Sequence, residues 1–251
     1  MIKNTTEALY ADETGHRQKG KKYWLWSFST KTEAFFAIRK KRNGNVVKEI
    51  LGREFFGVLI TDFWKPYLAV KSRFRQWCVA HFLREFKKIE FGNNNSPPEY
   101  LAFKKKVKRL FRDALSFAKK ENITSQAKKK AQKRFLKRLD KIVENYKDSN
   151  IKDINRLTKR LKKYRDGFFT FVSITGVDAT NNYAERIIRY AVIMRKISFH
   201  TMSNEGSETM AILMTIFKTL ELRGIDPLKG TLEIIKNEIK KRHFQKRRLA
   251  A

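Results

Sequence analysis

The chain of 251 residues contains a single cysteine. One thiol excludes a disulfide framework and any zinc site built from several cysteines, and it is typical of a reducing compartment. Apolar runs are also short: none reaches the length of about 18 residues that predicts a transmembrane helix, and the start lacks the apolar stretch of a signal peptide. We therefore expect an intracellular protein without a membrane segment.

Acidic residues are scarce as well. There are 25 Asp and Glu against 57 Lys and Arg, which gives a formal net charge of +32. Such an excess predicts a polyanionic partner, either nucleic acid or an anionic membrane surface. A wholly disordered basic protein is excluded, because 41% of the residues are hydrophobic and 20 are phenylalanine.

The first ninety residues show a mixed α/β pattern. We expect a first strand at residues 9–12, ended by a turn at Thr14 and Gly15, because glycine favours turns. Apolar and aromatic runs predict a hairpin and a further strand, and helical spacing of apolar residues predicts one helix that ends at Gly52. The expected strands of the hairpin are 22–30 and 34–38, the helix is 45–51 and the last strand is 55–63.

A strongly basic block follows a Gly, Asn and Pro-rich breaker segment at residues 91–98. Residues 100–165 hold 24 Lys or Arg against 6 Asp or Glu, a net charge of +18. Apolar residues recur every three or four positions, which predicts two or three amphipathic helices with basic outer faces. Such faces are either solvated helix surface or contacts to DNA phosphates, and the spacing leaves both open.

The C-terminal part continues with a short apolar segment at 168–174 and two helices, at 182–197 and 208–222. We expect residues 236–251, which are basic and terminal, to fray.

Three acidic residues stand out against this background. Asp12 follows the first expected strand, Asp62 ends the most apolar strand, and Glu185 lies one turn into an expected helix. Carboxylates at strand ends beside one from a helix can hold two Mg²⁺ ions, which prefer hard oxygen ligands. Each also has a structural interpretation: Asp12 as a turn residue, Asp62 as a helix N-cap, and Glu185 as the partner of Asn182 in a capping box.

The residues that flank these carboxylates form five motifs in a fixed order. They are Asp12-Glu-Thr-Gly15, Thr61-Asp-Phe-x-x-x-Tyr67, Cys78-Val-Ala-His-Phe-Leu-Arg84, Thr180-Asn-Asn-x-Ala-Glu-Arg186, and Arg195-Lys-Ile-Ser198 followed by Ser203-x-x-Gly206. From about residue 8 to residue 227 the chain resembles the catalytic region of bacterial DDE transposases of the insertion-sequence 66 (IS 66) family.

This resemblance implies an α/β fold: an RNase H-like mixed sheet with an all-helical insertion between the second and third catalytic acidic residues. The core would comprise residues 1–90, with Asp12 and Asp62, and residues 167–230, with the Glu185 helix. The basic insertion would be 91–166 and the basic tail 231–251.

The resemblance also implies an activity. Asp12, Asp62 and Glu185 would be the catalytic and metal-binding triad, holding two Mg²⁺ or Mn²⁺ ions for DNA cleavage and strand transfer. The implied partners are the transposon ends and target DNA, with a homo-oligomer as the working complex, in the bacterial cytoplasm at the nucleoid. Residues expected to contact DNA are Asn181, Asn182, Arg186, Arg189, Arg195 and Lys196.

The sequence departs from the family pattern in two places. Family members carry an N-terminal half with DNA-binding and zinc-binding segments, whereas this sequence starts shortly before Asp12, so we expect a truncated or split transposase. Residues 198–203 replace a glycine-rich, arginine-bearing turn. The alternatives are therefore a catalytically idle DNA-binding remnant and a structure-specific nuclease.

A few other residues could take part in binding. Cys78 and His81 lack a second metal-ligand pair, so we expect a structural role for them. His16 lies close to Asp12 in sequence and could contact a substrate, although a single loop histidine is usually neither ligand nor catalyst. The four tryptophans, at positions 24, 26, 64 and 77, are expected in or near the core.

Overall fold

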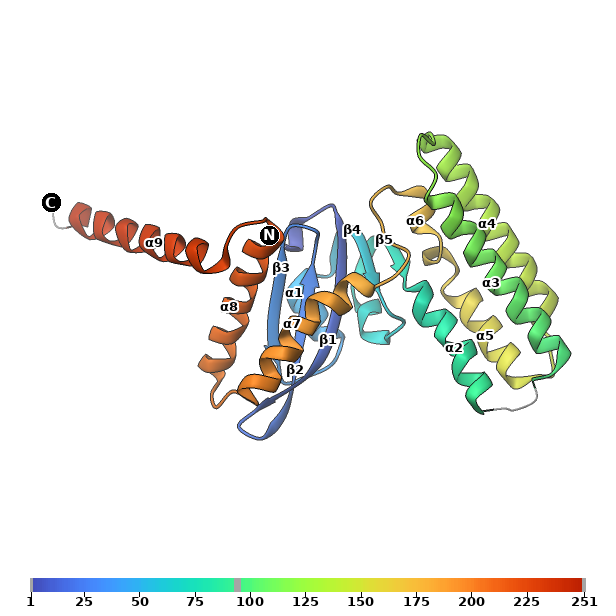
Figure 1. Cartoon of the computed structure of the whole chain (residues 1–251), viewed down its shortest axis with the longest axis horizontal. Helices are drawn as coiled ribbons and strands as arrows, with labels where there is room; N and C mark the ends of the chain where they lie inside the picture. The colour runs from blue at the N-terminus through green and yellow to red at the C-terminus, as the bar shows by residue number, and fades with distance from the viewer. Residues whose placement is uncertain (1, 93–95, 250–251) are drawn as a thin grey trace. The chain divides into compact units, whose positions relative to one another are not determined.

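The computed structural model describes residues 2–92 and 96–249. The chain divides into two compact units, each assembled from segments that are distant in sequence. The first unit is built mainly from residues 10–46 and 184–251, and the second from residues 3–9 and 47–183. Figure 1 labels the elements along the chain.

The strands form one five-stranded mixed sheet in the order β3-β2-β1-β4-β5. Antiparallel pairing joins β1 to β2 and β2 to β3, whereas β4 and β5 run parallel. An α/β fold with a mixed sheet was expected, and the structure confirms it at this level. The strands are β1 (Ala8–Gln18), β2 (Lys21–Ser29), β3 (Ala34–Arg39), β4 (Glu54–Thr61) and β5 (Lys71–Trp77).

The first strand is longer than predicted. β1 continues through Thr14 and Gly15, which pair with Leu25 and Trp24 of β2, so the expected turn at that place is wrong. The chain reverses instead between β1 and β2 at residues 19 and 20, where both φ angles are positive (47° and 73°). Two consecutive positive φ angles suit the tight turns that match the twist of a hairpin.

β5 was not predicted, because its sequence is mostly polar. Only its last two residues, Gln76 and Trp77, are buried, so it lacks an alternating apolar pattern. The predicted helix before β4 and the predicted strand β4 are both present. Helix α1 spans Gly44–Leu51 and is followed by Gly52 at a φ of +86°, which a glycine adopts without steric cost.

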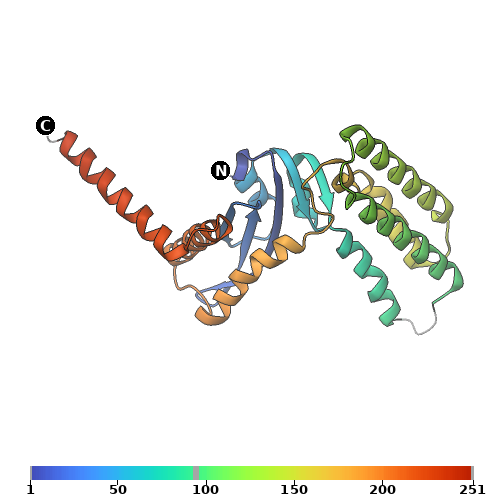
Figure 2. The same cartoon turned by 45° about the horizontal axis from the view of Figure 1, so that its top comes forward.

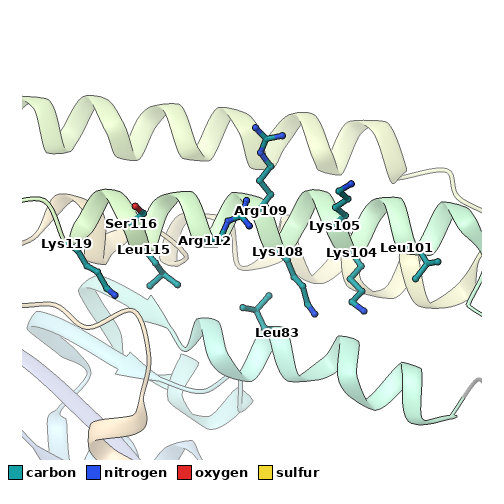
Figure 3. Close-up of a pocket in the computed structure, with 10 residues that line it drawn as sticks. All are labelled: Leu83, Leu101, Lys104, Lys105, Lys108, Arg109, Arg112, Leu115, Ser116 and Lys119. Atoms are coloured by element: carbon teal, nitrogen blue, oxygen red, sulfur yellow. The ribbon is translucent and has the colours of Figure 1, made fainter.

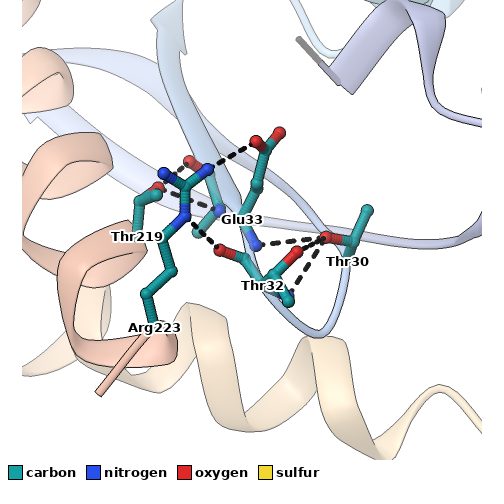
Figure 4. A network of polar contacts seen from close by, with 6 residues as sticks. Thr30, Thr32, Glu33, Thr219 and Arg223 are labelled. Carbon is teal, nitrogen blue, oxygen red and sulfur yellow. Dashed lines mark hydrogen bonds and ion pairs between the residues drawn. The ribbon is translucent and has the colours of Figure 1, made fainter. Parts of the chain in front are cut away.

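Helix α8 (Asn204–Leu222) covers the edge strand β3. Threonines of α8 form the hydrogen bonds that a neighbouring strand would otherwise form. Thr215 Oγ1 accepts a hydrogen bond from the backbone N–H of Phe36, and Thr219 Oγ1 accepts from the N–H of Ala34 and donates to its carbonyl oxygen. Beyond them, Arg223 forms an ion pair with Glu33 (Figure 4). Two backbone donors of this edge strand, those of Ala34 and Phe36, are thereby satisfied.

The second unit contains a helical bundle. Two views show α3, α4 and α5 side by side (Figures 1 and 2). Two or three amphipathic helices were expected in the basic block, and the structure has three, α3, α4 and α5. The helices are α2 (Val79–Gly92), α3 (Pro98–Ala118), α4 (Ser125–Tyr146), α5 (Lys152–Lys163) and the short α6 (Thr170–Ser173). Short 3₁₀ turns lie at Ile2–Asn4, Lys65–Ala69 and Arg165–Gly167.

Aromatic side chains form much of the core of this unit. Phe82 lies 5.4 Å from Phe168 and 6.0 Å from Phe111 between ring centroids, in tilted and edge-on arrangements. Gln76 is fully buried among them and hydrogen-bonds the backbone at Phe168 and Phe171. This amide fastens the end of β5 to the segment that returns from the bundle.

Two further helices complete the first unit. Helix α7 spans Asn182–Ser198 and α9 spans Pro227–Leu249. The expectation that residues 236–251 fray is wrong as far as Leu249, because α9 continues to that residue. No helix in the described ranges 2–92 and 96–249 is long and apolar enough to cross a membrane.

Candidate functional site

Asp12 lies within β1, opposite Ser27 of β2, and its side chain is half-buried. Its Oδ1 accepts a hydrogen bond of 2.9 Å from the backbone N–H of Glu13. Because the strand continues for six residues beyond it, the interpretation of Asp12 as a turn residue is wrong. Its assignment as a metal ligand stays a prediction.

Asp62 comes directly after β4, whose last five residues are all buried. Its Oδ1 accepts a hydrogen bond of 2.9 Å from the N–H of Trp64. Trp64, rather than Asp62, holds the N-cap position of the following 3₁₀ turn. The aspartate therefore shapes the turn with one carboxylate oxygen instead of capping a helix.

Glu185 projects from the first turn of α7 and is half-buried. The helix begins at Asn182, so Asn181 precedes its first residue and Glu185 is the fourth helical residue. A capping box needs the acidic residue at the third helical position after the cap. The boundary of α7 therefore does not favour the pairing of Glu185 with Asn182 in such a box.

These three carboxylates are divided between the units. Asp12 and Glu185 belong to the first and Asp62 to the second, and their convergence stays a prediction. Within the described residues no three His, Cys, Asp or Glu side chains form a group that could hold a metal ion. The donor set nevertheless fits Mg²⁺ or Mn²⁺ chemically, because all three side chains supply carboxylate oxygens.

Arg195 was expected to contact DNA, and its guanidinium lies against β1. It donates hydrogen bonds to the backbone oxygen of Gly15 and to Oγ1 of Thr14. These bonds fasten the C-terminal half of α7 to the strand that carries Asp12. Of the other expected DNA contacts, Asn181 is buried, whereas four are exposed on α7: Asn182, Arg186, Arg189 and Lys196.

Cys78 and His81 have structural surroundings. The Cys78 sulfur accepts a hydrogen bond of 3.2 Å from the backbone N–H of Asn181, and burial raises the pKa of the thiol. The neighbouring Val79 N–H donates to the backbone oxygen of Ala179. His81 lies 3.2 Å from a guanidinium nitrogen of Arg84. This motif thus holds the segment before α7, in agreement with the structural role expected.

One polar network was missed by the sequence reasoning. His16 on β1 is buried, and its Nε2 lies 3.0 Å from Thr201 Oγ1, which in turn lies 2.6 Å from Ser207 Oγ. Ser207 donates to Oε1 of Gln18, so the segment that departs from the family pattern is tied to the end of β1. Burial, followed by the charges of Arg195 and His200, lowers the pKa of His16.

The serine that follows this segment has a plain structural function. Ser203 caps α8, because its Oγ accepts a hydrogen bond of 3.0 Å from the N–H of Gly206. The Ser203-x-x-Gly206 motif is thus a helix start.

The model of the "Transposase IS66 family" matches residues 3–209, a range that includes all three candidate carboxylates. No curated protein matches the chain.

Proposed function

Because the chain belongs to the IS66 family of transposases, we propose that it performs metal-dependent DNA cleavage and strand transfer with a DDE triad. The observation that carries this proposal is the family match over residues 3–209, which spans Asp12, Asp62 and Glu185. The five-stranded mixed sheet and the helices between Asp62 and Glu185 support an RNase H-like core with a helical insertion.

The proposed roles follow from the chemistry of the side chains. Asp12, Asp62 and Glu185 would hold two Mg²⁺ or Mn²⁺ ions, which supply activation of the attacking oxygen and charge neutralisation at the leaving oxygen of a phosphodiester. Arg186 and Arg189 are exposed on the Glu185 helix and would bind the phosphates beside the scissile bond.

The exposed side chains of Asn182 and Lys196 would add contacts to the same DNA strand, and Asn181 would position the start of α7. Arg195 acts differently in this proposal, because its bonds to β1 keep the helix in register with Asp12. The protein would work on transposon ends and target DNA as a homo-oligomer, at the nucleoid in the bacterial cytoplasm.

The test is an assay of DNA ends taken from the genomic sequence that flanks the gene, supplied both uncut and pre-cut. Joined products in Mg²⁺ or Mn²⁺ support a transposase, cleavage without joining supports a structure-specific nuclease, and DNA binding without either supports an idle remnant. Asp62→Asn should abolish products. The matched control is Asp148→Asn, because Asp148 is an exposed aspartate between α4 and α5.

A further inference from the structure

A basic groove runs between α2 and α3 in the second unit. Its volume is about 940 Å³. The lining contains six cationic side chains, three leucines and one serine, and neither an acidic nor an aromatic residue is among these ten. Figure 3 shows them: Leu83, Leu101, Lys104, Lys105, Lys108, Arg109, Arg112, Leu115, Ser116 and Lys119.

Eight of these residues lie in α3 and recur at helical spacing along its length, Lys119 is the C-cap residue of α3, and Leu83 lies in α2. From Leu101 to Lys119 the helix rises by roughly 27 Å at about 1.5 Å per residue. This length corresponds to roughly eight base pairs of duplex DNA, which advances about 3.4 Å per nucleotide of each strand. One helix thus presents a line of cations long enough to follow a DNA backbone.

The charge of the groove is largely uncompensated. Lys104 forms an ion pair with Glu90 of α2. In the described part of the chain, none of the ion pairs involves the other five cations of the groove, at positions 105, 108, 109, 112 and 119. Two other acidic residues of the bundle pair with arginines outside the groove, Asp113 with Arg138 and Asp140 with Arg165.

The composition of the lining also restricts the ligand. Grooves for single-stranded nucleic acid stack bases on aromatic side chains, and this lining has none. Amide side chains, which read adenine, and carboxylate side chains, which read cytosine, are missing from it as well. Lysine and arginine donors suit phosphate oxygens, which carry no sequence information.

We propose that the α2–α3 groove binds the phosphate backbone of duplex DNA without sequence preference. This inference rests on the proposed function for the identity of the polyanion, but the groove contains none of the candidate catalytic residues. According to this inference, DNA contacts only one face of the basic block, the groove face of α3. The outer face of α4 is then solvated surface.

The experiment compares two triple variants of the whole chain. The groove variant is Lys105→Gln with Lys108→Gln and Arg112→Gln. The control removes three exposed lysines at similar spacing on α4: Lys129→Gln, Lys133→Gln and Lys137→Gln. Glutamine has nearly the same helix propensity as lysine and arginine, and circular dichroism would confirm equal folding.

Binding is measured without divalent metal, on two 20-base-pair duplexes of unrelated sequence and on one of their single strands, between 50 and 200 mM salt. Each lost phosphate contact removes about 0.9 from the slope of log K against log salt. The groove variant should therefore lose about 2.7 of slope and on the order of 10²-fold in affinity near 0.1 M salt, equally on both duplexes. The α4 control should stay close to wild type.

Several outcomes would overturn the proposal: no duplex binding by the wild type, an unchanged slope in the groove variant, equal losses in both variants, or preference for the single strand. Cleavage is scored separately in Mg²⁺. If the groove variant loses duplex binding, this inference is supported even when the wild type cleaves nothing. If the wild type cleaves DNA and the groove variant binds duplex normally, only the proposed function is supported.

Discussion

Replacement of Glu185 by glutamine separates a catalytic role from a structural one. The change keeps the size of the side chain and removes one negative charge from the first turn of α7. Loss of a charge that interacts with the helix dipole costs about 0.3–1 kcal/mol. In a chain of this size, a loss of about 1 kcal/mol lowers Tm by roughly 2–4 °C. A purely structural Glu185 therefore predicts a small change in Tm and unchanged activity.

A metal-binding Glu185 predicts a much larger effect on the reaction. Charge stabilisation by a bound divalent ion is worth several kcal/mol, and a loss of about 3 kcal/mol lowers the rate by about 10²-fold. DNA binding without metal should persist or tighten, because one carboxylate that repels phosphate is gone. Cleavage in Mn²⁺ and DNA affinity without metal are the two measurements.

The matched control is Glu205→Gln, since Glu205 is an exposed acidic residue in the first turn of α8. A second readout does not depend on turnover: a bound ion raises Tm in proportion to the logarithm of its concentration. The Mn²⁺-dependent rise should persist in wild type and the control and shrink in Glu185→Gln. If Glu185→Gln keeps both cleavage and this rise, the triad assignment is refuted.

Two further predictions concern stability. Gly167→Ala should lower the free energy of unfolding in urea by about 1–3 kcal/mol, because its Cβ would lie 2.5 Å from the Trp77 ring. The control Gly206→Ala should be neutral or slightly stabilising, because the new Cβ meets only the Ser203 hydroxyl, at 3.4 Å. Equal effects of the two changes would contradict this packing argument. Because the folded-state pKa of His16 is lowered, the contribution of this side chain to stability is intact above its ordinary pKa of about 6.5 and is lost as the pH falls below that value. Between pH 7.5 and 5.5, wild type should therefore lose more free energy of unfolding than His16→Gln. Parallel losses in the two proteins would contradict the burial argument.

Much of the fold was predictable wherever local periodicity determines the structure. The apolar face of α7 and the amphipathic helices of the basic block were read from spacing, because one buried face suffices to define each helix. β5 was missed because tertiary context, rather than an alternating pattern, makes it a strand beside β4. The extension of β1 through Gly15 was missed for the same reason: its partners in β2 determine it.

The candidate site was predictable only in part. Motif order predicted the three carboxylates, which stay a prediction, and the structure removes the turn interpretation of Asp12. Charge alone suggested that Arg195 contacts DNA, but the sequence cannot show that the backbone of β1 lies within its reach. The groove was hidden for a similar reason, since a net charge of +18 over residues 100–165 does not show which face lacks acidic partners.

The threonines of α8 have a consequence for how the protein is made. Ala34 and Thr219 are 185 residues apart, so a ribosome completes β3 long before it reaches the helix that covers this edge. At about 5–20 residues per second, the delay is roughly 9–37 s. During that interval the nascent chain carries an open strand edge, which is a template for pairing with other chains. We therefore expect slower synthesis to lengthen this interval, and chaperone binding to the open edge to limit pairing with other chains.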